Sequence, residues 1–191
     1  MTRRLALASL SVAAVGAAAL ALSLAGSATV RAPVSWATFA FSRSEVAGGG
    51  IFVGRGNRTR LVAPGGTDPD WSPDARRLVY LAPGAGGAAD VFAADADGGN
   101  RGRLTATLGD EASPDWAPDG RRLVVERDGR IVVLRADGRY LRTLADGAEP
   151  AWSPGGRRIA FAADGDLFVV ADRGGRPRRL TQTPAGESSP A

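Results

Sequence analysis

The chain has 191 residues, of which 44% are hydrophobic and 23% charged, which suits one ordinary domain with an apolar core. It contains no histidine, no cysteine and no lysine, so all 24 of its basic residues are arginine. These absences exclude a Ser-His-Asp triad, a cysteine nucleophile, a lysine Schiff base and the ordinary zinc or copper sites.

The net charge of +4 is weak support for nucleic-acid binding. Arg3, Arg4 and Arg31 lie near the N-terminus, which leaves 21 arginines against 20 acidic residues in the body. No run of basic residues alternates with aromatic ones, as a nucleic-acid-binding surface would show. We therefore expect no nucleic acid among the partners of this chain.

Residues 1–32 have the layout of a secretory signal: two arginines, an apolar run over residues 5–24, and small residues after it. Cleavage after Ala28 or Ala32 would suit a peptidase that prefers small residues at that point. The apolar run is also long enough to span a bilayer as a helix, so an uncleaved membrane anchor is the alternative. Both readings place the body outside the cytoplasm of a bacterial cell, in the periplasm, the envelope or the medium, because the arginines stay inside.

The body, residues 33–191, repeats one pattern. Trp71, Trp116 and Trp152 each end a short predicted strand and are followed by a Pro-containing turn of the Ser-Pro-Asp-Gly type, then by Arg-Arg and an apolar run. Pro presets the second position of such a turn, and Gly relaxes the fourth. Three more strands are expected after each tryptophan, joined by Asp-Gly turns. In order, these predicted strands are residues 78–82, 90–95 and 101–105; 123–126, 129–138 and 140–144; and 159–163, 166–172 and 177–181.

An earlier unit supplies three strands before Trp71, at residues 37–43, 49–54 and 60–66. About four short strands in each unit, with tryptophans 45 and 36 residues apart, indicate the blades of a β-propeller. We expect an all-β fold of about four four-stranded blades. The expected blades are residues 37–70, 71–115, 116–151 and 152–191.

Two features of the repeat are interpreted as structural. One tryptophan per blade at a fixed position favours packing between neighbouring sheets over ligand stacking. The string DADGGN at Asp95–Asn100 is similar to the start of a calcium loop, but Ala106 stands where such a loop needs its last glutamate. A hairpin turn explains it better, and we expect no metal and no cofactor.

Acidic residues also recur in the loops that lead to each tryptophan. We consider the hypothesis that these residues form a ring around the central channel and bind a cation or a basic peptide. As catalytic acids they are less suitable, because repeated positions normally serve the repeat. The residues concerned are Asp110, Glu111, Glu149 and Glu187.

The repeat resembles that of TolB-type β-propellers, also called the PD40 or WD40-like repeat. The resemblance rests on W-S-P-D-G-R-R-[LI]-[AV], then D-[LIV]-[FY], then D-x-D-G-G-x-x-R-R-L-T, and extends over residues 37–191. Two turn positions depart from it, Ala75 in place of Gly and Gly155 in place of Asp. The resemblance implies an exported propeller that binds proteins, and about six blades, so we expect this chain to be a partial propeller.

These observations predict an exported, non-catalytic β-propeller that serves as a binding scaffold for a protein or another ligand. The alternative is the gating propeller of a prolyl-oligopeptidase-like serine peptidase, because the same repeat occurs there. That reading needs a G-x-S-x-G motif with a partner Asp and His, which this chain does not contain as a set. No catalytic, metal or cofactor residue is predicted, the partner-binding residues stay unknown, and an open propeller is expected to self-associate.

Overall fold

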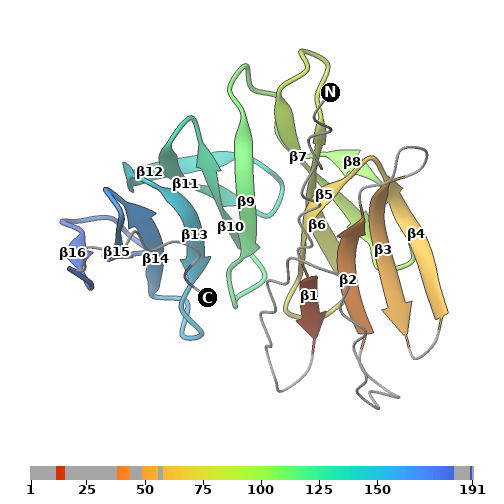
Figure 1. Cartoon of the computed structure of the whole chain (residues 1–191), viewed down its shortest axis with the longest axis horizontal. Helices are drawn as coiled ribbons and strands as arrows, with labels where there is room; N and C mark the ends of the chain where they lie inside the picture. Colours follow the sequence, from red (N-terminus) through yellow and green to blue (C-terminus); the bar gives the residue numbers. More distant parts are fainter. Residues whose placement is uncertain (1–11, 16–37, 44–48, 56–57, 183–189, 191) are drawn as a thin grey trace, which may run out of the picture.

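The computed structural model of the chain describes residues 12–15, 38–43, 49–55, 58–182 and 190. These residues form sixteen strands in four four-stranded antiparallel sheets, and no helix occurs among them. Figure 1 shows the sheets side by side in a fan, with the chain passing from one sheet to the next in order. The expected all-β fold of about four four-stranded blades is confirmed.

The sheets are named blades 1 to 4 in chain order. Blade 1 comprises β1 (Val12–Val15), β2 (Thr38–Arg43), β3 (Gly50–Arg55) and β4 (Arg58–Pro64). Blade 2 comprises β5 (Thr67–Trp71), β6 (Arg77–Pro83), β7 (Ala89–Asp95) and β8 (Gly102–Arg103). Blade 3 comprises β9 (Glu111–Trp116), β10 (Arg122–Arg127), β11 (Arg130–Arg135) and β12 (Tyr140–Asp146). Blade 4 comprises β13 (Ala148–Trp152), β14 (Arg158–Ala163), β15 (Asp166–Ala171) and β16 (Arg178–Arg179).

Each repeated tryptophan ends the first strand of its blade, as the sequence predicts. Trp71 pairs with Leu78 on the strand that follows the turn, and Trp116 and Trp152 pair in the same way. The tryptophan strand therefore belongs to the sheet after it. Blades 2, 3 and 4 accordingly begin four or five residues before the expected bounds, at Thr67, Glu111 and Ala148.

Side chains that alternate along the strands form the three contacts between blades. Each blade turns a row of mostly small aliphatic residues toward the next blade, which we call its small row. It turns a row of larger residues, with the tryptophan, toward the previous blade, which we call its large row. In blade 2 the small row is Val79, Leu81, Val91 and Ala93, and the large row is Trp71, Leu78, Tyr80, Phe92 and Ala94.

The repeated tryptophans lie in these contacts. Trp71, Trp116 and Trp152 are only 5–8% exposed, and each belongs to a different core cluster formed by two neighbouring blades. Arg122 adds a cation–π contact, with its guanidinium carbon 4.6 Å from the centre of the Trp152 ring. The packing interpretation of the tryptophans therefore agrees with the structure.

The turn after each tryptophan needs a left-handed residue at its fourth position. Ala75 has φ 57° there, and Gly120 and Gly156 have φ 65° and 64° in blades 3 and 4. An L-residue with a Cβ is strained in this region, whereas glycine is not.

We expect Ala75→Gly to raise the free energy of unfolding by about 0.5–1 kcal/mol, after the extra chain entropy of glycine is subtracted. Urea unfolding measures this effect, with Gly120→Ala as the matched control that should lower stability instead. A loss of stability in Ala75→Gly would contradict the strain argument.

The turn at Asp95–Asn100 joins β7 to β8. Gly98 N–H donates to the Asp95 carbonyl at 2.8 Å, and the Asn100 side chain donates to the Asp95 carboxylate at 2.6 Å. This string is a hairpin turn, as expected. Within the described ranges, no group of three or more acidic, histidine or cysteine side chains could hold a metal ion.

The predicted signal or anchor, residues 1–32, lies outside the described residues except for Val12–Val15. Those four residues are the strand β1, which pairs with β2 as the first strand of blade 1, rather than part of a helix. No helix in the described part of the chain is long and apolar enough to cross a membrane. The signal and the anchor remain predictions.

Candidate functional site

The four acidic residues proposed to form a ring do not occupy equivalent places. The pairing registers of β9 and β13, aligned at their tryptophans, make Gly147, which directly precedes β13, and not Glu149 the equivalent of Glu111. Glu149 corresponds instead to Ser113 of β9. Asp110 is exposed and accepts a hydrogen bond from the Ala89 backbone N–H at 2.9 Å. Glu187 lies outside the described residues, so the described part of the chain does not bring these acids together as a ring.

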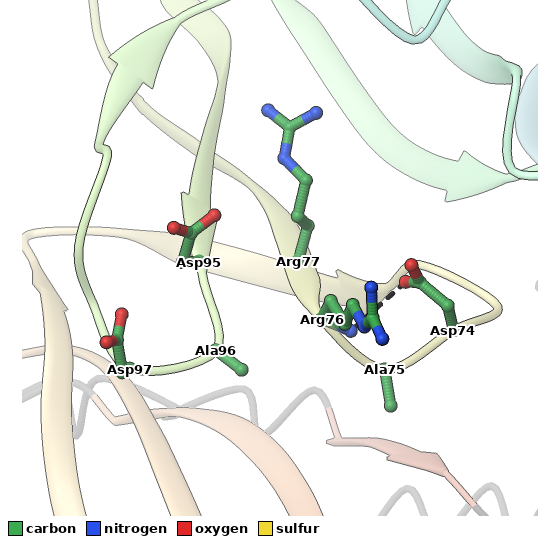
Figure 2. Close-up of a pocket in the computed structure, with 7 residues that line it drawn as sticks. All are labelled: Asp74, Ala75, Arg76, Arg77, Asp95, Ala96 and Asp97. Atoms are coloured by element: carbon green, nitrogen blue, oxygen red, sulfur yellow. Dashed lines mark hydrogen bonds between the residues drawn. The ribbon is translucent and has the colours of Figure 1, made fainter.

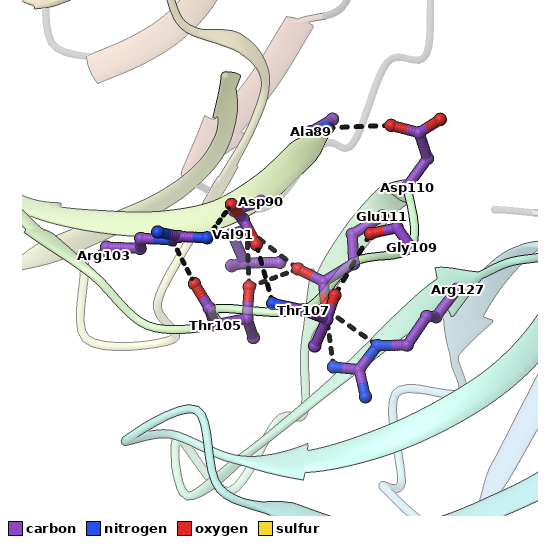
Figure 3. A network of polar contacts seen from close by, with 10 residues as sticks. All are labelled: Ala89, Asp90, Val91, Arg103, Thr105, Thr107, Gly109, Asp110, Glu111 and Arg127. Atoms are coloured by element: carbon purple, nitrogen blue, oxygen red, sulfur yellow. Dashed lines mark hydrogen bonds and ion pairs between the residues drawn. The ribbon is translucent and has the colours of Figure 1, made fainter. Parts of the chain in front are cut away.

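Glu111 is buried between blades 2 and 3, with 2% of its surface exposed. One carboxylate oxygen accepts the backbone N–H of Val91 at 3.0 Å and a hydrogen bond from the Thr105 hydroxyl. The other oxygen accepts Nε and Nη2 of Arg127 at 2.8 and 2.5 Å. Figure 3 shows the carboxylate between these partners, which come from both blades. Glu111 is thus a paired buried charge that joins two blades.

The neighbouring pair in blade 2 extends this network. Nη2 of Arg103 lies 2.5 Å from the Asp90 carboxylate, which is fully buried, and its Nε donates to the Thr105 carbonyl at 2.6 Å. The other carboxylate oxygen of Asp90 accepts the Thr107 N–H at 3.3 Å. Asp90, Arg103 and Thr105 therefore hold the outer strand β8 to β7 by side chains, where the ladder between the two strands is short.

The same arrangement recurs in blade 4. Asp166 contacts Arg179, the Thr181 hydroxyl accepts the Leu167 N–H at 2.8 Å, and Arg179 Nε donates to the Thr181 carbonyl at 2.8 Å. Blade 3 lacks it, because Arg130 stands at the aspartate position. No prediction from the sequence included these residues. The joint recurrence of D-[VL]-F and R-L-T in the second and fourth repeats was the signal that could have found them.

A second polar joint connects the first strands of neighbouring blades. The Asp70 carboxylate of β5 accepts the backbone N–H of Trp116 in blade 3 at 2.7 Å. The Asp115 carboxylate of β9 accepts the N–H of Trp152 in blade 4 at 2.6 Å. Ala151 takes this position in β13, so the described blade 4 has no carboxylate of this kind. The aspartates that precede Trp71 and Trp116 therefore each accept a tryptophan N–H from the next blade.

A bulge precedes each of these positions. Asp68, Ser113 and Glu149 have φ of 47°, 48° and 51°, and the pairing register shifts beside each one. A left-handed residue before a proline is uncommon for any residue except glycine. The bulge re-aims the strand just before Asp70 and Asp115, as β-bulges commonly do.

The two aspartates influence one another. Burial raises the pKa of Asp70 to about 6. The hydrogen bonds from the backbone N–H groups of Trp116 and Trp71 act in the opposite direction and lower this pKa, but their effect is smaller. Burial, and then the negative charge of Asp70, raise the pKa of Asp115 to about 8. Two carboxylates so close together disfavour double ionisation, so the pair holds a proton near neutral pH. Both carboxylates are engaged with backbone N–H groups of the next blade.

A polar depression of about 520 Å³ lies beside the first turn of blade 2. Figure 2 shows Asp74 and Arg76 on one side of it and Asp95 and Asp97 on the other. Asp74 accepts the Ser72 hydroxyl at 2.7 Å and the Arg76 N–H at 3.1 Å, and these bonds lower its pKa. Asp97 accepts the Gly99 N–H at 2.9 Å. These carboxylates stabilise their own turns, which leaves no convergent set for catalysis at this depression.

Four sequential antiparallel blades, joined by tryptophan-containing cores and by buried carboxylates, define a β-propeller array. A comparison with solved structures identifies the type of propeller that this fold resembles. The chain matches a protein assigned as TolB from Agrobacterium tumefaciens with a TM-score of 0.66 and 24% identity, over 75% of this chain and 61% of that one. It matches TolB from Acinetobacter baumannii with a TM-score of 0.61 and 19% identity, over 79% of this chain and 42% of that one. The chain therefore has a TolB-like β-propeller fold.

Propellers of proteases share the architecture. The β-propeller domain of the Trilobed protease from Pyrococcus furiosus matches with a TM-score of 0.56 and 11% identity, over 78% of this chain and 54% of that one. The chain thus spans less than two thirds of the length of each of these structures. A scan against known protein families finds no match, and no curated protein matches either.

Proposed function

We propose that this chain is an exported, non-catalytic propeller that holds a protein or peptide partner. The observation that supports this most is the use of the buried acidic groups. Asp70, Asp115 and Glu111 are all engaged in contacts between blades. We therefore assign partner binding to the exposed loops. The likeness of the fold to TolB proteins is consistent with such a scaffold.

The loop between β8 and β9 is the partner-binding candidate. Leu108 lies in it with 99% of its surface exposed, which is unusual for a large aliphatic side chain. A photo-crosslinking amino acid at position 108 is expected to capture a partner in the producing cell. The same probe at Arg139, an exposed turn residue of blade 3, is the matched control. Equal capture at both positions, or none at position 108, would overturn this assignment of the loop.

Export is tested by the mass and the location of the chain. We expect the protein outside the cytoplasm, with a mass that begins at Thr29 or Pro33. Cleavage there would also remove β1, so that β2 becomes the inner edge of blade 1. Full mass in the membrane fraction indicates the anchor instead, and full mass in the cytoplasm contradicts export.

The second candidate is the gating propeller of a serine peptidase, supported by the likeness to the Trilobed protease propeller. A fluorophosphonate probe, which labels reactive serines, distinguishes the two candidates. The scaffold predicts no labelling of the purified protein or of any chain that co-purifies with it. Labelling of either one favours the peptidase.

A further inference from the structure

The two end blades each turn one apolar row away from the rest of the array. The outward row of blade 4 is its small row, which corresponds by strand register to the small row of blade 2. In blade 2 these residues are 0–5% exposed, because blade 3 covers them. In blade 4 three of the four are partly exposed among the described residues. The small row of blade 4 is Ala160, Ala162, Leu167 and Val169.

The outward row of blade 1 is its large row. Phe39, Phe41 and Phe52 stack along it, with ring centroids 5.8 and 5.6 Å apart. The residues that correspond to Phe39 and Phe41 in blade 2 are Leu78 and Tyr80. Those two are 0% and 4% exposed, whereas Phe39 and Phe41 are only partly buried. We call these three residues the phenylalanine row.

The three contacts inside the array all join the small row of one blade to the large row of the next. In the contact between blades 3 and 4, for example, Val124 and Val133 lie in one cluster with Ile159 and Phe161. The two outward rows are therefore the two halves of a fourth contact of the same kind. Within one chain, blades 2 and 3 separate them (Figure 1).

We propose that the small row of blade 4 docks the phenylalanine row of blade 1 from a second copy of this chain. The contact is heterologous, since two different surfaces meet, so copies join head to tail. Its strength comes from apolar burial, as in the contacts inside the array. The proposal does not rest on the proposed binding function, because it concerns the end faces and not the loops.

The oligomeric state of the purified chain tests the proposal. We expect a concentration-dependent dimer or larger species by sedimentation, and a loss of it in Val169→Arg and in Phe41→Arg, each weakening association at least about 100-fold. Phe52→Arg is the second variant for the blade 1 face, should Phe41→Arg fail to fold by circular dichroism. Tyr140→Arg, at an exposed side chain of blade 3 that belongs to neither row, is the control that should associate like the wild type. All variants are compared with the same N-terminus, verified by mass, because residues 5–24 are apolar.

Mixing the variants tests the direction of the contact. Val169→Arg keeps an intact phenylalanine row, and Phe41→Arg keeps an intact small row. A mixture is therefore expected to form a one-to-one dimer that neither variant forms alone. A wild type that stays monomeric overturns the proposal. So does association that survives Val169→Arg, or a loss with Val169→Arg but none with Phe41→Arg, which would indicate contact between two blade 4 faces.

Discussion

Replacing Glu111 with alanine is expected to lower the free energy of unfolding by about 3 kcal/mol, a large effect for one side chain. The substitution leaves the Arg127 guanidinium without its carboxylate partner and removes the acceptor of the Thr105 hydroxyl. Arg127 is 19% exposed, so water reaches part of it and keeps the loss below that of a fully buried pair. Urea unfolding, followed by tryptophan fluorescence, measures the change.

The neighbouring residue supplies the matched control. Asp110 is exposed and makes one hydrogen bond to a backbone N–H, so Asp110→Ala should cost less than about 1 kcal/mol. A double-mutant cycle of Glu111→Ala with Arg127→Ala should also give a clear coupling energy, since the two side chains are in direct contact. Equal costs for Glu111→Ala and Asp110→Ala would refute the role of Glu111 as a joint between blades.

The second large effect is a dependence of stability on pH. Asp70 and Asp115 bind protons more tightly in the folded chain than in the unfolded chain, where their pKa is near 3.8. Folding therefore takes up protons between about pH 4 and pH 8, and the free energy of unfolding falls as the pH rises through that window. We expect this pair to make the protein roughly 2–3 kcal/mol less stable at pH 8 than at pH 5. Urea midpoints over this range measure the slope.

The variant Asp115→Asn identifies the source of that slope. Its amide oxygen can still accept the Trp152 N–H, while the second negative charge is gone. Stability at pH 8 should rise by about 1–2 kcal/mol and the slope between pH 5 and pH 8 should flatten. Asp119→Asn is the control, because Arg121 N–H and Arg122 hold the pKa of that partly exposed carboxyl low, which leaves the slope unchanged. An Asp115→Asn protein with the wild-type slope would disprove the shared-proton account.

Much of the fold could be predicted from the sequence because its signals are local. A strand that alternates apolar side chains, such as β6, and a turn such as Ser72–Arg77 depend on residues a few positions apart. The recurrence of the tryptophan string then gave the number of blades. The fold that TolB structures share followed from the same repeat.

The acidic positions show where prediction from local sequence failed. Glu111 and Glu149 both precede a tryptophan in an acidic loop, so the sequence suggests equivalent roles. The structure separates them by two places in register, because Glu111 corresponds to Gly147. Glu111 therefore reaches the buried Thr105 hydroxyl and the Val91 N–H of the previous blade.

The strands, the turns and the repeated order of blades follow from local sequence, since each depends on short-range sterics and on the burial of one face of a strand. The partners of the carboxylates depend instead on how the blades pack. Asp70 meets Trp116, a residue 46 positions away on another sheet. That meeting depends on how two sheets pack and on the bulge beside Asp68, which shifts the register locally. The pattern of one strand carries no information about the distance to the next sheet.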